Sequence, residues 1–319
     1  MKEIMFLSGN HKLSVYTLFI YECVPVFLGH GDAFVPVRFE VIFMILNVSN
    51  NTDLVRFYNG WLQKRFDDGY FAVETEKLNN IYELSPKNFE LVVFQTKDPH
   101  NLFEDFEYLD RLGYQSVAMV TLTPYKAEVE PGLNKKQVLE DLVLLGKKYP
   151  HRVVWKYSPI IINNEYSEKY HLKKFDSLCQ KLSGAVRACI VEFVEPFEQP
   201  IHACLYSAVV DMGTKTKMLS QMQEIAQKYQ IAVYAKGTKN SVVKLMRSIL
   251  CHCGVSKDAN IDVFDMGLPN TCKGMCQYCF VGGNKFVGKH TNCIVSSPIM
   301  IGEVNKTKKH IKRKIARLT

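Results

Sequence analysis

The chain has 319 residues, of which 47% are hydrophobic, and 40 Lys and Arg against 32 Asp and Glu give a net charge of +8. This hydrophobic share can fill a large core, which excludes disordered and collagen-like chains. Ten cysteines in this length are not a disulfide scaffold, and five of them lie between Cys251 and Cys279, which favours metal binding in a reducing compartment such as the cytoplasm.

Residues 1–40 differ in pattern from the rest of the chain. They contain aromatic and β-branched runs without a helical period, and we interpret them as an N-terminal extension of unknown role. Residues 13–29 are fairly apolar, but Glu22 interrupts them and no clean cleavage site follows. This pattern disfavours both a signal peptide and a membrane span.

From residue 41, short apolar runs alternate with amphipathic stretches. The run 42–48 is typical of a strand buried on both faces, and Thr52 or Asp53 can cap a following helix over 54–65. Further strands are predicted at 91–96, 116–123, 152–157, 188–194, 231–235 and 261–266. Helices are predicted at 101–112, 135–148, 168–183, 217–229 and 241–250.

Seven strands separated by helices predict a parallel α/β fold, which is either a doubly wound sheet or a TIM-type (β/α) barrel. The barrel is favoured because polar residues recur at the carboxyl ends of the strands, where barrels place their sites. Seven strands are one fewer than the eight of a TIM barrel, which leaves an incomplete barrel open as an alternative. We expect the barrel over 41–250, a cysteine-rich region over 251–303 that completes it, and a basic tail over 304–319.

The polar strand ends are the predicted substrate and cofactor site, although each could instead cap a turn. They are Ser49, Asn51, Asp53, Gln95, Lys97, Thr121, Thr123, Tyr125, Lys156, Tyr157, Glu192, Glu195 and Lys236. We predict that Lys97, Lys156, Tyr157 and Glu192 are catalytic and that Thr123 contacts a cofactor. These five side chains and that of Tyr125 are expected to point into one cavity, with the cysteine loop across its opening.

Cys272, Cys276 and Cys279 form a C-x3-C-x2-C pattern directly after the strand predicted at 261–266. Three thiolates on one tight loop can hold three irons of a [4Fe-4S] cluster and leave the fourth iron open for a chelating ligand. This is the arrangement of radical S-adenosylmethionine (SAM) chemistry, and Gly274 allows the loop to turn. A zinc loop, which favours C-x2-C pairs, and cysteines without metal are the alternatives.

Cys251 and Cys253 flank His252 and are further candidate metal ligands. They could complete the cluster, bind a second metal or form a redox pair, and ordinary reduced thiols are the alternative. If one of them bound the fourth iron, SAM would be excluded. Cys293 could contribute as well.

The tail carries seven basic residues and no acidic one between residues 305 and 319. Ile311, Ile315 and Leu318 are spaced as on one face of a helix, which predicts a basic amphipathic helix. Residues 306–317 would then contact nucleic-acid phosphates or an acidic partner, whereas a solvated, frayed terminus is the alternative.

Seven blocks of the chain carry a family resemblance: residues 47–53, 95–99, 121–125, 130–131, 154–160, 270–279 and 297–302. In this order they resemble the bacterial family called domain of unknown function 1848. The resemblance covers residues 42–303 and implies a barrel whose radical-SAM-like cysteine loop comes last in the sequence. It also implies that Tyr278 lies beside the SAM adenine, and we assign Asn270 to the same cofactor site.

The chain departs from the family at several substrate-facing positions. The family usually has two arginines at Asn50 and Asn51, an arginine at Lys156 and an aspartate at Ser158. Asparagine cannot replace the planar fork of arginine on a carboxylate or phosphate. We therefore predict a radical-SAM-like iron–sulfur enzyme that needs a reductant and acts on a divergent, unknown substrate. The alternative is a non-catalytic barrel that binds iron–sulfur or zinc and contacts nucleic acid or protein through its tail.

Overall fold

The computed structural model describes ten segments of the chain. They are residues 23–26, 33–36, 42–49, 51–74, 78–194, 210–235, 260–268, 271–279, 293–301 and 309–313. The predicted site residues Cys251, Cys253, Asn270, Glu195 and Lys236 lie outside the described residues. The helix predicted at 241–250 and most of the N-terminal extension also lie outside them.

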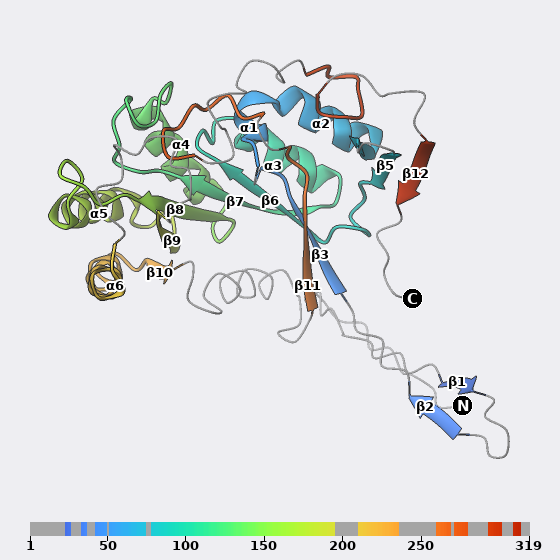
Figure 1. Cartoon of the computed structure of the whole chain (residues 1–319), viewed down its shortest axis with the longest axis horizontal. Coiled ribbons are helices and arrows are strands. Elements are labelled where there is room, and N and C mark those ends of the chain that lie inside the picture. The colour runs from blue at the N-terminus through green and yellow to red at the C-terminus, as the bar shows by residue number, and fades with distance from the viewer. Residues whose placement is uncertain are drawn as a thin grey trace.

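A sheet of seven parallel strands forms the centre of the protein, in the order β10-β9-β8-β7-β6-β3-β11 (Figure 1). The strands are β3 (Ile42–Asn47), β6 (Leu91–Thr96), β7 (Gln115–Thr121), β8 (Val153–Ile160), β9 (Ala188–Phe193), β10 (Ala232–Ala235) and β11 (Asn260–Asp265). Each matches a strand predicted from the sequence, with ends shifted by at most a few residues. The expected parallel α/β fold is confirmed.

Helices follow the strands and begin at polar caps. They are α1 (Leu54–Phe57), α2 (Asn59–Asp68), α3 (Leu102–Arg111), α4 (Lys135–Lys148), α5 (Glu168–Leu182) and α6 (Met212–Gln227). The side chains of Asn134, Ser167 and Asp211 accept a hydrogen bond from the first turn of α4, α5 and α6. Because Asp211 caps α6, this helix begins at Met212, earlier than the predicted start at residue 217. The single helix predicted over 54–65 is divided into α1 and α2, because the backbone dihedrals of Tyr58 are not helical.

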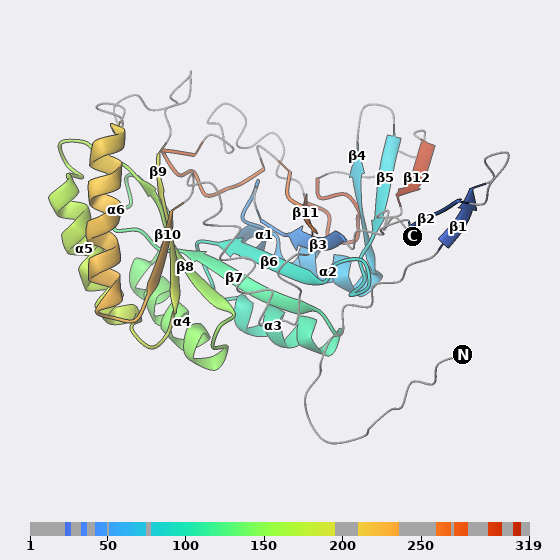
Figure 2. The ribbon, with the colours of Figure 1, turned by 90° about the horizontal axis from the view of Figure 1, so that it is seen from below.

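The order of the strands identifies a barrel-type sheet. From β3 to β10 each strand lies beside the next one in the sequence, and β11 returns to pair with β3. Right-handed connections, the rule for parallel strands, then place all helices on one face. Figure 2 shows α3, α4, α5 and α6 following one another along the outside of the sheet. These helices lie on one face of the sheet, whereas a doubly wound sheet carries helices on both faces, so the barrel type is the observed one. Among the described residues β10 and β11 are not paired, so this barrel is incomplete.

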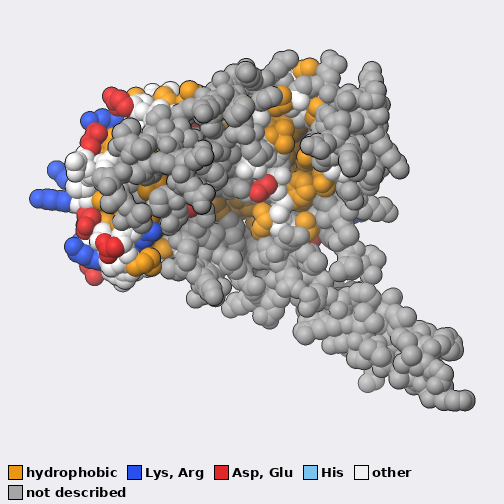
Figure 3. All heavy atoms as spheres, in the orientation of Figure 1, with side chains coloured by type: hydrophobic (Ala, Val, Ile, Leu, Met, Phe, Trp, Pro, Cys, Tyr) orange, Lys and Arg blue, Asp and Glu red, His pale blue; other side chains and the backbone are white. Residues whose placement is uncertain are grey.

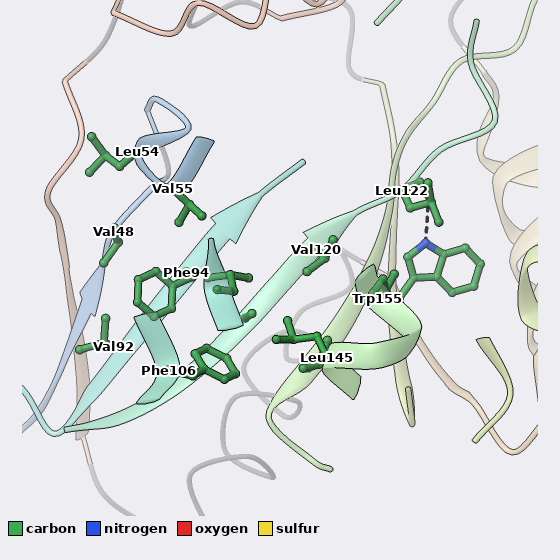
Figure 4. Packing of buried hydrophobic residues seen from close by; sticks show 14 of the residues in the cluster. Val48, Leu54, Val55, Val92, Phe94, Phe106, Val120, Leu122, Leu145 and Trp155 are labelled. Carbon is green, nitrogen blue, oxygen red and sulfur yellow. Dashed lines mark hydrogen bonds between the residues drawn. The ribbon is translucent and has the colours of Figure 1, made fainter. Parts of the chain in front are cut away.

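Apolar side chains cover both faces of the sheet. On the outer face Phe94 and Trp155 pack with Phe106 of α3 and Leu145 of α4 (Figure 4). Trp155 Nε1 donates to the carbonyl of Leu122 at 2.9 Å, which satisfies its only polar group. A smaller inner cluster contains Ile45, Leu91, Val93, Val117, Met119, Val154, Ala188 and Ile190. Burial on both faces explains why the strands read as continuous apolar runs.

Two small antiparallel pairings accompany the sheet. One joins β1 (Cys23–Val26) to β2 (Ala33–Pro36), and the other joins β4 (Tyr70–Glu74) to β5 (Leu78–Glu83). The tail strand β12 (Lys309–Arg313) pairs in parallel with β5. The predicted tail helix is therefore wrong over these residues. The open edge of β5 offers backbone hydrogen bonds that a free amphipathic helix would not gain.

Charges of both signs are mixed around α5 and α6 on the face shown in Figure 3. No helix of the described residues is long and apolar enough to cross a membrane.

Candidate metal centre

The cysteine loop, residues 271–279, crosses the carboxyl ends of β3 and β7. Tyr58, which follows α1, donates its hydroxyl hydrogen to the carbonyl of Thr271 at 2.6 Å. The N–H of Gln277 donates to the carbonyl of Val129, in the loop after β7, at 3.0 Å. The loop is thus fixed at the end of the sheet where barrel proteins place their sites.

The three thiols of this loop are free and partly exposed. A Cβ built on Gly274 would lie 3.4 Å from Cys272 Sγ and 3.7 Å from Cys276 Sγ, so the two sulfurs flank this glycine. Burial raises the pKa of Cys272, whereas the backbone N–H groups of Asp53 and Gly274 oppose the rise. Burial raises the pKa of Cys276 to about 11. These thiols are therefore protonated at neutral pH and would release protons on binding a metal.

The donor set fits an iron–sulfur cluster. Three thiols lie on one loop, and backbone N–H groups approach a sulfur, as is common around clusters. Over the described segments, no three His, Cys, Asp or Glu side chains are arranged to hold a single metal ion. We therefore assign no mononuclear metal site in this part of the chain.

A buried carboxylate next to the loop gathers four side chains. Glu130 is fully buried and accepts hydrogen bonds from Lys97, Lys135 and Tyr278, and from Thr123 Oγ1 at 2.6 Å. The ammonium of Lys97 also donates to the hydroxyl of Tyr278 and lies 4.9 Å from its ring centroid. Burial alone would raise the pKa of Glu130, but Lys97 and Lys135 lower it to about 2. We call Lys97, Glu130 and Lys135 the Glu130 network.

The Glu130 network anchors Tyr278, the residue before the third cysteine. The Tyr278 ring packs 6.1 Å from the ring of Tyr125, in a cluster with Val129 and Ile161. Tyr125 itself is buried, and its hydroxyl donates to the carbonyl of Pro159 and accepts from the N–H of Ile161. Tyr125 therefore packs against the ring of Tyr278, and the prediction that it points into the site cavity is wrong.

Asp53 ties the start of α1 to the end of β6. Its carboxylate accepts from the N–H of Arg56 at 3.1 Å and from the N–H of Lys97 at 2.9 Å. This contact fixes the backbone of Lys97, so the cap of α1 also positions the lysine beside the cysteine loop.

A row of polar side chains lines the inner face of the sheet at its carboxyl end. Asn47 Nδ2 donates to Asp265 Oδ1 at 2.6 Å, and Gln95 Nε2 donates to Asn47 Oδ1 at 2.9 Å. Lys156 Nζ in turn donates to Gln95 Oε1 at 3.2 Å. The row thus runs from β11 across β3 and β6 to β8.

Glu192 continues this inner face on β9, where its carboxylate accepts from Ser158 Oγ at 2.9 Å. The predicted inward direction of Tyr157 is wrong. Tyr157 is fully buried in the outer core, and its hydroxyl lies 2.8 Å from Nδ1 of His171 on α5. Because successive strand residues point to opposite faces, Lys156 and Tyr157 cannot both face the interior.

The structure thus brings Lys97, Thr123 and Tyr278 together beside the cysteine loop, and it places Lys156 and Glu192 on the inner face of the sheet. Sequence reasoning missed Glu130 and Lys135 as site residues. The only sequence signal for Glu130 was its place, before a proline, in one of the family-like blocks.

Sequential parallel strands with helices outside define an α/β protein of the (β/α)-barrel type. A family model matches residues 45–255, and the chain belongs to the family described as Domain of unknown function (DUF1848). The family resemblance predicted over 42–303 is confirmed within this range, which ends before the cysteine loop. No curated protein matches the chain.

The chain is also similar to a solved structure, the HMG-CoA lyase from Brucella melitensis. The identity is 12%, the TM-score is 0.33, and the alignment covers 76% of this chain and 85% of the lyase.

Proposed function

We propose that this protein is a radical-SAM-like iron–sulfur enzyme. The observation that carries the proposal is the cysteine loop: Cys272, Cys276 and Cys279 lie on one short loop fixed across the carboxyl ends of the parallel strands. Barrel proteins place their sites at this end of the sheet, so a cluster held by the triad would lie where a substrate is expected.

The proposed roles of the residues follow from their positions. The three cysteines would hold a [4Fe-4S] cluster, which when bound supplies an electron for the reductive cleavage of SAM. Tyr278 would support the adenine, because its ring is fixed between Glu130 and Tyr125 directly before Cys279.

The substrate would lie against the inner-face row. Lys156 and Glu192 offer one cation and one anion there, next to the neutral amides of Asn47 and Gln95. Lysine binds an oxyanion as a point charge and not as a bidentate fork. A carboxylate or phosphate group of a small substrate would bind Lys156, the carboxylates of Glu192 and Asp265 would face its hydrogen-bond donors, and an electron donor is required.

The first test is anaerobic reconstitution with iron and sulfide, followed by metal analysis and visible absorbance. We expect about four irons per chain and a charge-transfer band. Cys276→Ala should lose both, whereas Cys179→Ala, a buried core cysteine on α5, should keep them. Stoichiometric zinc without iron in both aerobic and anaerobic preparations would refute the cluster.

The second test separates the SAM enzyme from a cluster protein without SAM. The electron paramagnetic resonance (EPR) spectrum of the reduced cluster should change when SAM is added, because SAM would bind the open iron. An unchanged spectrum in the wild type and in a Cys251→Ala/Cys253→Ala double variant would contradict the SAM enzyme. A change in the double variant alone would show that one of these thiols occupies the fourth iron.

A further inference from the structure

The Glu130 network contains one more cation than anion in a buried place. Lys97 and Lys135 both bind the single carboxylate of Glu130, and their side chains are only 19% and 27% exposed. The other groups that bind this carboxylate, Thr123 and Tyr278, are neutral hydroxyls. A charge in such surroundings is costly unless an opposite charge lies close by.

Neighbouring charged groups do not cancel this surplus. The charges of Asp53 and Arg56 offset each other, because the two groups interact electrostatically. Lys126 pairs with Glu165 at 2.9 Å on the exposed surface. Among the described residues, the one acidic side chain that Lys97 and Lys135 bind is Glu130 itself.

The surplus charge faces the cysteines. Lys97 interacts electrostatically with Cys276 and Cys279, and Lys135 interacts with Cys276. Three thiolates outweigh the charge of an oxidised cubane core by a single negative charge, which would balance the surplus.

We infer that the Glu130 network is the counter-charge of the metal centre and sets the reduction potential of its cluster. Lys97 and Lys135 act as positioning residues, because their charge acts on the cluster without ligating it. The inference rests on the proposed function, and it adds the reason why two lysines converge on one buried carboxylate. A more positive network stabilises the reduced, more negative cluster and raises its potential.

The inference predicts opposite effects for two changes that each remove one charge. Glu130→Gln adds a positive charge to the network, so the potential should rise. Lys135→Gln removes one, so the potential should fall. Coulomb's law at an effective dielectric constant of about 20 gives a change on the order of tenfold in the ratio of reduced to oxidised cluster for a unit charge roughly 10 Å away. For a one-electron couple, tenfold corresponds to about 59 mV.

The double variant Glu130→Gln/Lys135→Gln is the matched control. It restores the wild-type net charge while it removes the hydrogen bonds of both side chains. A potential close to that of the wild type is therefore expected. If the two side chains had a merely structural role, the potential of the double variant would instead differ from that of the wild type by more than the potential of either single variant.

The experiment is an EPR-monitored redox titration with dithionite on the reconstituted protein, with iron content measured on each sample. The inference is supported if the reduction potential shifts in opposite directions in the two single variants and returns to the wild-type value in the double variant. Equal iron content with unchanged potentials, or shifts in the same direction, would overturn it and leave the proposed function standing. A wild-type protein that takes up no iron overturns the proposed function, and this inference with it. Lys135 lies at the partly exposed start of α4, so Lys135→Gln keeps the test decisive if Glu130→Gln does not fold.

Discussion

Replacing the buried carboxylate of Glu130 by an amide should lower the stability of the metal-free protein substantially. The pKa of Glu130 is about 2 instead of 4.5, because Lys97 and Lys135 overcome the cost of burial. At 1.36 kcal/mol for each pKa unit, this difference amounts to about 3 kcal/mol. Removing one partner of a buried ion pair typically costs about 3–5 kcal/mol, which agrees. We therefore expect Glu130→Gln to reduce the free energy of unfolding in urea at pH 7 by about 3 kcal/mol.

The stabilisation by Glu130 depends on pH. The pKa of Glu130 in the folded protein is depressed, so its contribution to the free energy of unfolding is complete above pH 4.5 and is lost as the pH falls toward 2. The difference in stability between wild type and Glu130→Gln should therefore shrink as the pH is lowered through this range. Glu107→Gln is the control, because its ion pair with Lys148 is exposed and should contribute little. Equal stability of wild type and Glu130→Gln at pH 7, or a difference that grows on acidification, would refute the reasoning.

Three further predictions concern the fold. Burial raises the pKa of Asp105 to about 6 from 3.8, so the free energy of unfolding of the wild type falls as the pH rises through about 6. This fall should amount to at most about 3 kcal/mol, and Asp105→Asn should not show it. Urea unfolding of both proteins at pH 4 and pH 7 measures the difference. Burial lowers the pKa of His171 to about 4 from 6.5, so wild type should lose about 3 kcal/mol between pH 6.5 and 4. A His171→Gln variant that loses as much over this range would contradict the assignment. At Gly146 a Cβ would meet the carbonyl oxygen of Ala185 at 2.2 Å, so Gly146→Ala should destabilise by about 1–3 kcal/mol. Gly60→Ala has open space in helix α2 and should stabilise by up to about 1 kcal/mol. Thermal melts of both variants test this pair, and equal effects at the two glycines would disprove the close packing at Gly146.

The hydrophobic pattern of the sequence was sufficient to locate the strands of the sheet. The predicted strand 91–96 and helix 135–148 coincide with β6 and α4. Such patterns are local: an apolar run or a polar cap depends on neighbours within one or two turns of chain. The C-x3-C-x2-C motif is equally local, so the candidate metal loop was visible before any fold was known.

The tertiary structure alone decided which polar residues meet. Lys97 and Glu130 are separated by 33 residues, and Tyr278 and Glu130 by 148. No local pattern marks such a pair, because the energy of a buried ion pair depends on distance and burial, which only the folded chain defines. The same holds for the tail, where the open edge of β5 fixes Lys309–Arg313 as a strand although the apolar spacing of the sequence favours a helix.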